Sequence, residues 1–83
     1  MQLRAQTPEQ LAALLRGQRT HTGLTQHQAA ALVGLLPKTI SALESDPGRC
    51  SVNSLYKLLS ALGLELIMQQ KGRATPSASK LEW

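Results

Sequence analysis

The chain has 83 residues, enough for one small domain with a core of limited size. Lys and Arg number 9 and Asp and Glu number 5, so the net charge of +4 favours an anionic partner such as nucleic acid. The only aromatic residues are Tyr56 and Trp83, which argues against a surface that stacks single-stranded bases and leaves double-stranded nucleic acid open.

Several other classes of protein are disfavoured. The single cysteine, Cys50, allows neither an internal disulfide nor a Cys-rich metal site, and fits a small half-buried residue in a reducing cytosol. His21 and His27 do not have the i, i+4 spacing of a metal pair. No nucleophile–base arrangement or phosphate-binding glycine loop is visible, and no signal peptide or membrane span. We therefore expect a cytoplasmic protein that is not an enzyme, without cofactor, metal, membrane or small-molecule ligand.

The first predicted helix begins at the run Thr7-Pro8-Glu9-Gln10. Thr7 can cap it, proline suits its first position, and Gln10 can complete a capping box. Its apolar face consists of Leu11, Leu14 and Leu15, and Arg16 and Arg19 are assigned to positions off this face. Gly23 ends the helix as a left-handed stop.

A second, short helix is predicted over residues 26–33. Thr25 can cap it, with Gln28 as the partner in a capping box, and Gly34 ends it. Its expected packing face consists of Ala29, Ala30, Leu32 and Val33.

Two more helices follow. Pro37 suits the first turn of a segment over residues 38–45, whose Ile40, Ala42 and Leu43 are available for packing, and Asp46-Pro47-Gly48 predicts a turn. Ser51 then caps a fourth helix that Gly63 closes. Its apolar stripe consists of Leu55, Leu58, Leu59 and Leu62.

Residues 64–70 have a different pattern. Leu64, Leu66 and Met68 alternate with Glu65, Ile67 and Gln69, which predicts a short strand. A lone strand cannot satisfy its own backbone groups, so the simplest partner is the same strand of a second copy. A fifth helix is the alternative, because Leu64, Ile67 and Met68 also fit helical spacing. Residues 1–71 thus form the predicted domain, and 72–83 read as a disordered tail.

The segment from Thr25 to Glu44 predicts a helix-turn-helix. Two short helices that meet at Gly34 must cross steeply, and Ala30 supplies the small residue where they touch. Leu35 is expected to fill the gap between them. Ile40 and Leu43 anchor the second helix inward, which leaves Lys38, Ser41 and the start of that helix free to enter a major groove.

These residues resemble a known family. Thr25-Gln26, Ala30, Gly34, Ile40-Ser41 and Leu43-Glu44 are similar to the lambda-repressor-like (xenobiotic-response-element) helix-turn-helix family over residues 8–63. Features that resemble the HipB-type antitoxins are Thr39-Ile40-Ser41, Glu44, Pro47, Leu64-Glu65-Leu66 and Leu81-Glu82-Trp83. The resemblance implies an all-α domain of four to five helices plus one short C-terminal strand that pairs across a homodimer. It also implies a repressor of its own operon that neutralises a HipA-like Ser/Thr kinase toxin.

The expected contacts follow from this geometry and this resemblance. Gln26 is expected to hold a phosphate through its amide and the positive helix end, the alternative being capping chemistry alone. Lys38 would reach a guanine edge or a phosphate, the alternative being a solvated lysine on the helix surface. Thr39 and Ser41 would donate to bases or phosphates, the alternative being hydrogen bonds within the helix. The family often opens this helix with polar residues, so Leu36 and Pro37 depart from its pattern. Apolar contact with thymine methyl groups is then expected from Leu36, Pro37 or Ala42.

Other surfaces have expected roles too. Dimerisation is assigned to Leu64, Leu66, Ile67 and Met68. Trp83 is expected to anchor in a pocket of the toxin, the alternative being a disordered chain end without a role. Further positive charges that could attract DNA, or simply be solvated, are Arg16, Arg19, Arg49 and Lys57. The leading function is an operator-binding antitoxin dimer. The alternatives are a stand-alone phage-type or housekeeping repressor and a protein-interaction module that does not bind DNA.

Overall fold

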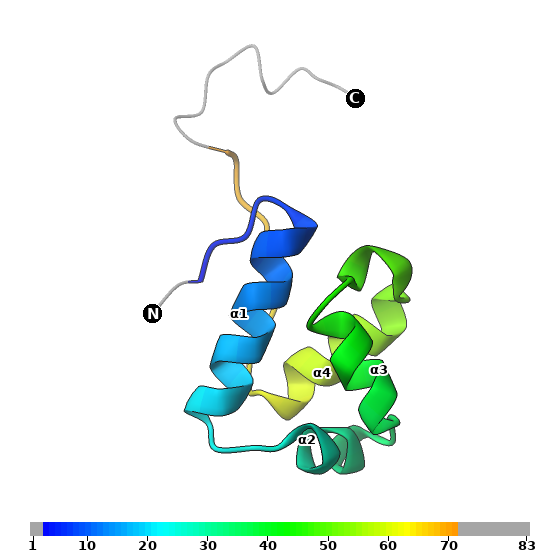
Figure 1. Ribbon diagram of the computed structural model, residues 1–83. Helices are drawn as coiled ribbons and strands as arrows, with labels where there is room; N and C mark the ends of the chain where they lie inside the picture. The colour runs from blue at the N-terminus through cyan, green and yellow to red at the C-terminus, as the bar shows by residue number, and fades with distance from the viewer. Residues whose placement is uncertain (1–2, 72–83) are drawn as a thin grey trace.

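The computed structural model describes residues 3–71, which form a bundle of short helices (Figure 1). In chain order these are α1 (Pro8–His21), α2 (Gln26–Val33), α3 (Pro37–Leu43), the short 3₁₀-helix η1 (Pro47–Arg49) and α4 (Val52–Ala61). The described part of the chain contains no strand. The predicted all-α class is confirmed.

Local capping chemistry starts α1 and α2. The Thr7 hydroxyl accepts a hydrogen bond from the Gln10 amide at 3.1 Å, and Pro8 occupies the first turn of α1. The capping box expected here differs by one residue, because the Gln10 side chain accepts from the Gln6 amide at 2.6 Å instead of from Thr7. The capping box of α2 is complete: Thr25 Oγ1 accepts from the Gln28 amide at 3.0 Å, and Gln28 Oε1 from the Thr25 amide at 2.9 Å.

The three glycines expected to end helices all adopt left-handed backbone. Their φ angles are 80° at Gly23, 70° at Gly34 and 72° at Gly63. A residue with a Cβ adopts this conformation only with strain, so glycine allows the chain to leave each helix at a sharp angle.

The third helix is shorter than predicted. It ends at Leu43, whereas the sequence indicated a helix that continues to Ser45. The amides of Ser45 and Asp46 both donate to the Ala42 carbonyl, which tightens the last turn. Asp46 precedes a proline and is therefore biased away from helical backbone. The predicted turn at Asp46-Pro47-Gly48 includes the first part of η1.

The core lies where all four α-helices meet. Its largest fully buried side chains are Leu15, Ile40, Leu43 and Leu58. From α2 come Ala29 and Ala30, whose small side chains let the neighbouring helices approach closely. Leu32, expected in this face, is instead 63% exposed. It is two residues from Ala30, which places it on nearly the opposite side of the helix. Cys50 is half-buried against the core, as expected.

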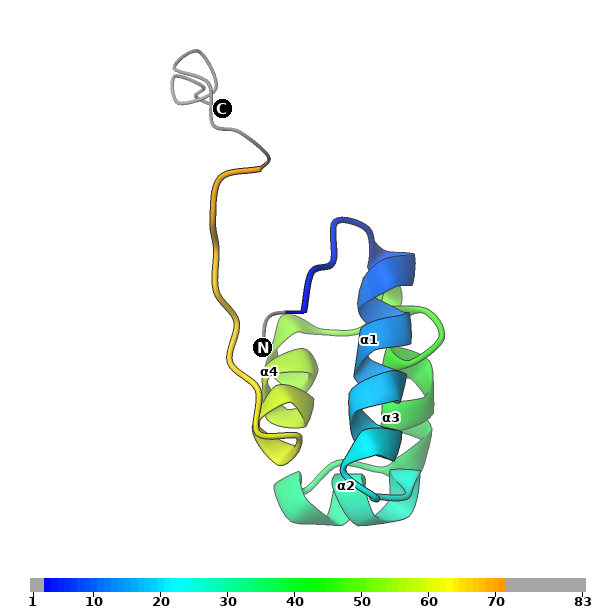
Figure 2. The same cartoon turned by 90° about the vertical axis from the view of Figure 1, so that its left-hand side faces the viewer.

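Residues 64–71 leave the end of α4 as a single non-helical segment that runs along the outside of the bundle (Figure 2). The fifth helix is therefore not formed. Only Leu64 packs against the core, whereas Leu66, Ile67 and Met68 are exposed. The apolar residues of this segment are left on the surface.

Glycine at position 17 should be replaceable with a gain in stability. It lies in the middle of α1, and a Cβ there would have no neighbouring atom within 4 Å. Gly17→Ala should raise the free energy of unfolding by about 0.5–1 kcal/mol, because alanine loses less backbone entropy on folding. Urea denaturation at fixed protein concentration measures this.

The matched control is Gly34→Ala, where a Cβ also meets no atom within 4 Å but φ is positive. This variant should lose about 1–2 kcal/mol from backbone strain. Equal effects of the two substitutions would contradict the assignment of strain to Gly34.

Candidate nucleic-acid interface

The turn between α2 and α3 is held by backbone and packing together. The Leu35 amide donates to the Ala30 carbonyl at 2.9 Å across the left-handed Gly34. The Leu35 side chain packs against the core, as predicted for a residue between the two helices. The chain can therefore reverse direction within three residues, and α2 and α3 form the steeply crossed pair that the sequence predicted (Figure 1).

One face of α3 is buried and the other is open to solvent. Ile40 and Leu43 are fully buried, whereas Lys38 and Ser41 are exposed. Leu36, which precedes the helix, is 59% exposed and provides no side-chain hydrogen bond to its first turn. The half-buried residues are Gln26, Pro37, Thr39 and Ala42. All seven residues expected at the DNA surface thus keep some exposed area.

Beneath this surface lies a buried ion pair between α1 and the end of α3. The Nε of Arg19 is 2.5 Å from Oε2 of Glu44, and its Nη2 is 3.1 Å from Oε1. Only 12% of the Arg19 side chain and 3% of the Glu44 side chain are exposed. The second terminal nitrogen of Arg19 donates to the Leu24 carbonyl at 2.8 Å. This arginine therefore ties together α1, the loop after it and α3.

Gln26, the first residue of α2, joins the same network. Its Nε2 donates to Oε1 of Glu44 at 3.2 Å. The sequence predicts that this amide holds a phosphate; the structure shows one of its N–H groups bonded to a carboxylate, and the phosphate contact stays a prediction. The Arg19 hydrogen bond to Glu44 raises the pKa of the guanidinium, although partial burial acts in the opposite direction. Arg19 therefore keeps its charge at any ordinary pH.

This network is not among the features that the sequence predicts. Arg19 is predicted to lie off the apolar face of α1, but it follows Leu11 and Leu15 at intervals of four residues and lies on that face. Glu44 likewise follows the buried Ile40 by four residues. The available signal for a buried ion pair was a pair of opposite charges on two helices. Each charge is in register with apolar residues of its own helix. The other cations weighed with Arg19, namely Arg16, Arg49 and Lys57, are exposed.

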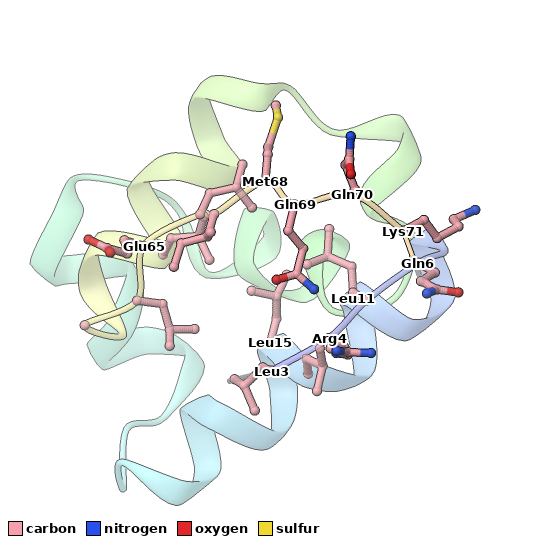
Figure 3. Close-up of a pocket in the computed structure, with 17 residues that line it drawn as sticks. Leu3, Arg4, Gln6, Leu11, Leu15, Glu65, Met68, Gln69, Gln70 and Lys71 are labelled. Carbon is pink, nitrogen blue, oxygen red and sulfur yellow. The ribbon is translucent and has the colours of Figure 1, made fainter. Parts of the chain in front are cut away.

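A groove on another side of the domain separates the N-terminal segment from the C-terminal one (Figure 3). Its volume is about 640 Å³, and its lining includes Leu3, Leu11, Leu66 and Ile67. Figure 3 shows Met68 and Gln69 pointing to opposite sides of the extended segment, as alternating side chains do. The groove therefore combines exposed apolar side chains with a stretch of backbone that has no strand partner among residues 3–71.

Among residues 3–71, no three His, Cys, Asp or Glu side chains gather in a way that could hold a metal ion. No helix of the described chain is both long and apolar enough to span a bilayer. Trp83, the residue expected to bind the toxin, lies outside the described residues, as does the tail over 72–83.

Loss of Arg19 should be costly. Arg19→Met keeps most of the aliphatic stem but leaves the Glu44 carboxylate buried without its cation. We expect the free energy of unfolding to fall by about 3–5 kcal/mol, as for other buried pairs that lose one partner. Thermal denaturation followed by circular dichroism gives the change. Arg49→Met is the control, because the Arg49–Asp46 pair is exposed and its closest N–O distance is 3.9 Å. Equal losses of unfolding free energy in both variants would show that the buried pair stabilises the protein no more than the exposed pair does.

Comparison with known proteins agrees with this geometry. A helix-turn-helix family model matches residues 15–67, which include α2, α3 and α4. The chain is 32% identical over 80 residues to antitoxin HipB of Escherichia coli O6:H1 (strain CFT073), covering 93% of this chain and 85% of that protein. It is 30% identical to antitoxin HipB of Escherichia coli (strain K12), covering 93% and 91% of the two chains.

Solved structures show the same likeness. A complex of a HipB variant with an O2 20mer superposes with a TM-score of 0.81 at 27% identity, covering 86% of this chain and 99% of that one. HipB in a HipA–HipB–O2–O3 complex gives a TM-score of 0.79 at 28% identity, with the same coverage. Together with the exposed α3 and the glycine turn, these matches show that the chain is a helix-turn-helix protein that belongs to the HipB antitoxin family, a family of DNA-binding regulators and not of enzymes.

Proposed function

We propose that this protein binds double-stranded operator DNA as a homodimer, represses its own operon and neutralises a HipA-like Ser/Thr kinase toxin. The observation that carries the DNA-binding part is the two-sided character of α3. Ile40 and Leu43 fix the helix to the core, so Lys38 and Ser41 project into solvent on a rigid support. Solved HipB structures that contain O2, O2–O3 or O4 sequences support the same reading.

The contacts within the groove are proposed residue by residue. Lys38 donates to a guanine edge or a phosphate, and Thr39 and Ser41 donate to nearby acceptors. Leu36, Pro37 and Ala42 offer apolar surface to thymine methyl groups. Leu36 is well suited to this role because 59% of it is exposed although it is apolar.

The dimer is proposed to form through residues 64–70. Their backbone extends along the surface without a strand partner in the described chain. Pairing with the same segment of a second copy would satisfy these groups and cover Leu66, Ile67 and Met68, while Leu64 already packs against the core. A dimer of this kind presents two α3 helices, which reach successive major grooves if they lie about 34 Å apart.

Toxin neutralisation is supported by the family and by the HipA–HipB–O2–O3 complex, in which a HipB chain occurs with HipA. In this chain the toxin would be controlled indirectly or by docking, because the family is one of regulators and not of enzymes. The proposed anchor, Trp83, stays a prediction.

Removing the Lys38 charge should weaken operator binding. Lys38→Ala is expected to cost about 1–3 kcal/mol and to relax base preference at one position if Lys38 contacts a base. If it contacts a phosphate, affinity should fall uniformly across sequences and the salt dependence should become less steep by about one counterion. Fluorescence anisotropy with the promoter duplex at several salt concentrations measures both quantities.

The matched control for that experiment is Lys57→Ala, because Lys57 is an exposed lysine on α4, outside the α2–α3 pair. Unchanged affinity in Lys38→Ala, or an equal loss in both variants, would remove Lys38 from the proposed interface.

A proline in the C-terminal segment should disrupt the dimer. Ile67→Pro removes a backbone N–H that a strand pair needs, so we expect the dissociation constant of the dimer to rise. Sedimentation equilibrium gives that constant, and Ile67→Val serves as the control because valine keeps both the N–H and the β-branched shape. A dimer as tight as the wild type would place the interface elsewhere on the domain.

A further inference from the structure

We propose that Glu44 is a positioning residue for DNA binding, because its buried carboxylate fixes the orientation of the Gln26 side-chain amide at the edge of the α2–α3 surface. The proposal rests on the DNA-binding function proposed above and deepens it. It assigns to one buried acid a role in binding in addition to its ion pair.

The geometry gives Glu44 more bonds than its ion pair requires. Arg19 already donates to both carboxylate oxygens, at 2.5 and 3.1 Å. The Glu44 backbone amide is bonded separately to the Ile40 carbonyl at 3.0 Å, so the side chain leaves from a fixed point at the end of α3. The additional bond from Gln26, at 3.2 Å, therefore positions the glutamine without being needed to neutralise the acid.

The chemistry of the pair decides which way the amide faces. An ionised carboxylate only accepts hydrogen bonds, so Gln26 must turn its NH₂ group, and not its oxygen, toward Glu44. The opposite orientation would place two acceptors 3.2 Å apart in a mostly buried site. One N–H of Gln26 is thereby used inside the protein. Its second N–H and its oxygen have no hydrogen-bond partner among residues 3–71, which leaves them for the duplex, and the N–H is the one that can donate to a phosphate oxygen.

Two opposing effects on binding make the proposal testable. Removal of a carboxylate near a polyanion should by itself tighten DNA binding, through less repulsion and an unneutralised Arg19. Loss of a fixed Gln26 orientation should weaken it. The sign of the change in affinity thus distinguishes a positioning role from a general electrostatic one.

The experiment is a double-mutant cycle of Glu44→Gln and Gln26→Met on the full chain. Affinity is measured with a duplex that the wild-type chain selects from a random pool. In the wild-type background, Glu44→Gln should weaken binding about three- to tenfold, an effect of the size of one hydrogen bond, because a glutamine amide can donate as well as accept and no longer forces the NH₂ group of Gln26 toward it. In the Gln26→Met background the same change should leave binding equal or tighter. Folded fractions from circular dichroism correct each affinity for any loss of stability.

A spectroscopic readout separates orientation from stability. The Gln26 side-chain NH₂ resonances of the folded protein should shift and exchange faster with solvent in Glu44→Gln. The slope of log affinity against log salt should match between wild type and Gln26→Met, because a neutral side chain releases no counterions.

Three outcomes would be decisive against the proposal: tighter or unchanged binding in Glu44→Gln alone, equal weakening in both backgrounds, or NH₂ resonances that do not respond. A wild-type chain that selects no duplex would instead overturn the proposed function itself, so the two failures are distinguishable.

Discussion

The arrangement of the helices depends on one buried ion pair, between Arg19 and Glu44. Helices as short as α2 and α3, with 8 and 7 residues, are marginal in water and need tertiary contacts to persist. The two side chains are removed from solvent, which is costly unless every polar atom finds a partner. Here the guanidinium bonds to Glu44 and to the Leu24 carbonyl, and the carboxylate also accepts from Gln26. The pair therefore holds α1, the start of α2 and the end of α3 in one fixed relation.

The apolar core complements this polar tie on the same inward face of α3, because Glu44 follows the buried Ile40 by four residues. Ile40 and Leu43 are fully buried against Leu15 and Leu58, and the alanines of α2 allow close packing. These contacts fix the rotation of α3 about its own axis. The buried side chains Ile40 and Leu43 therefore determine which residues of the helix face solvent. The core is small, however, and the exposed residues of the 64–71 segment indicate that one copy of the chain does not cover all of its apolar surface.

The sequence predicted what is decided locally. Thr25, Ser51 and the glycines at 23, 34 and 63 act through neighbours a few residues away, and each behaves in the structure as its residue type indicates. The non-local features were harder to predict. The partner of Arg19 is 25 residues away, so the register of Arg19 with Leu11 and Leu15 indicates burial but does not identify Glu44 as the residue that it pairs with. The packing of Leu32 and the direction of the Gln26 amide depend on which helices are neighbours, and that is settled only in three dimensions.

The uncharged opening of α3 has a consequence for discrimination between sequences. Lys38 is the only charged residue in this helix, and the residues before it are leucine and proline. Attachment to arbitrary DNA is mainly coulombic and weakens steeply as ionic strength rises, whereas contact with a methyl group displaces no ions. If Leu36 and Pro37 contact thymine, added salt should lower the affinity for random DNA more than the affinity for the operator. Selectivity for the operator then increases while overall affinity falls.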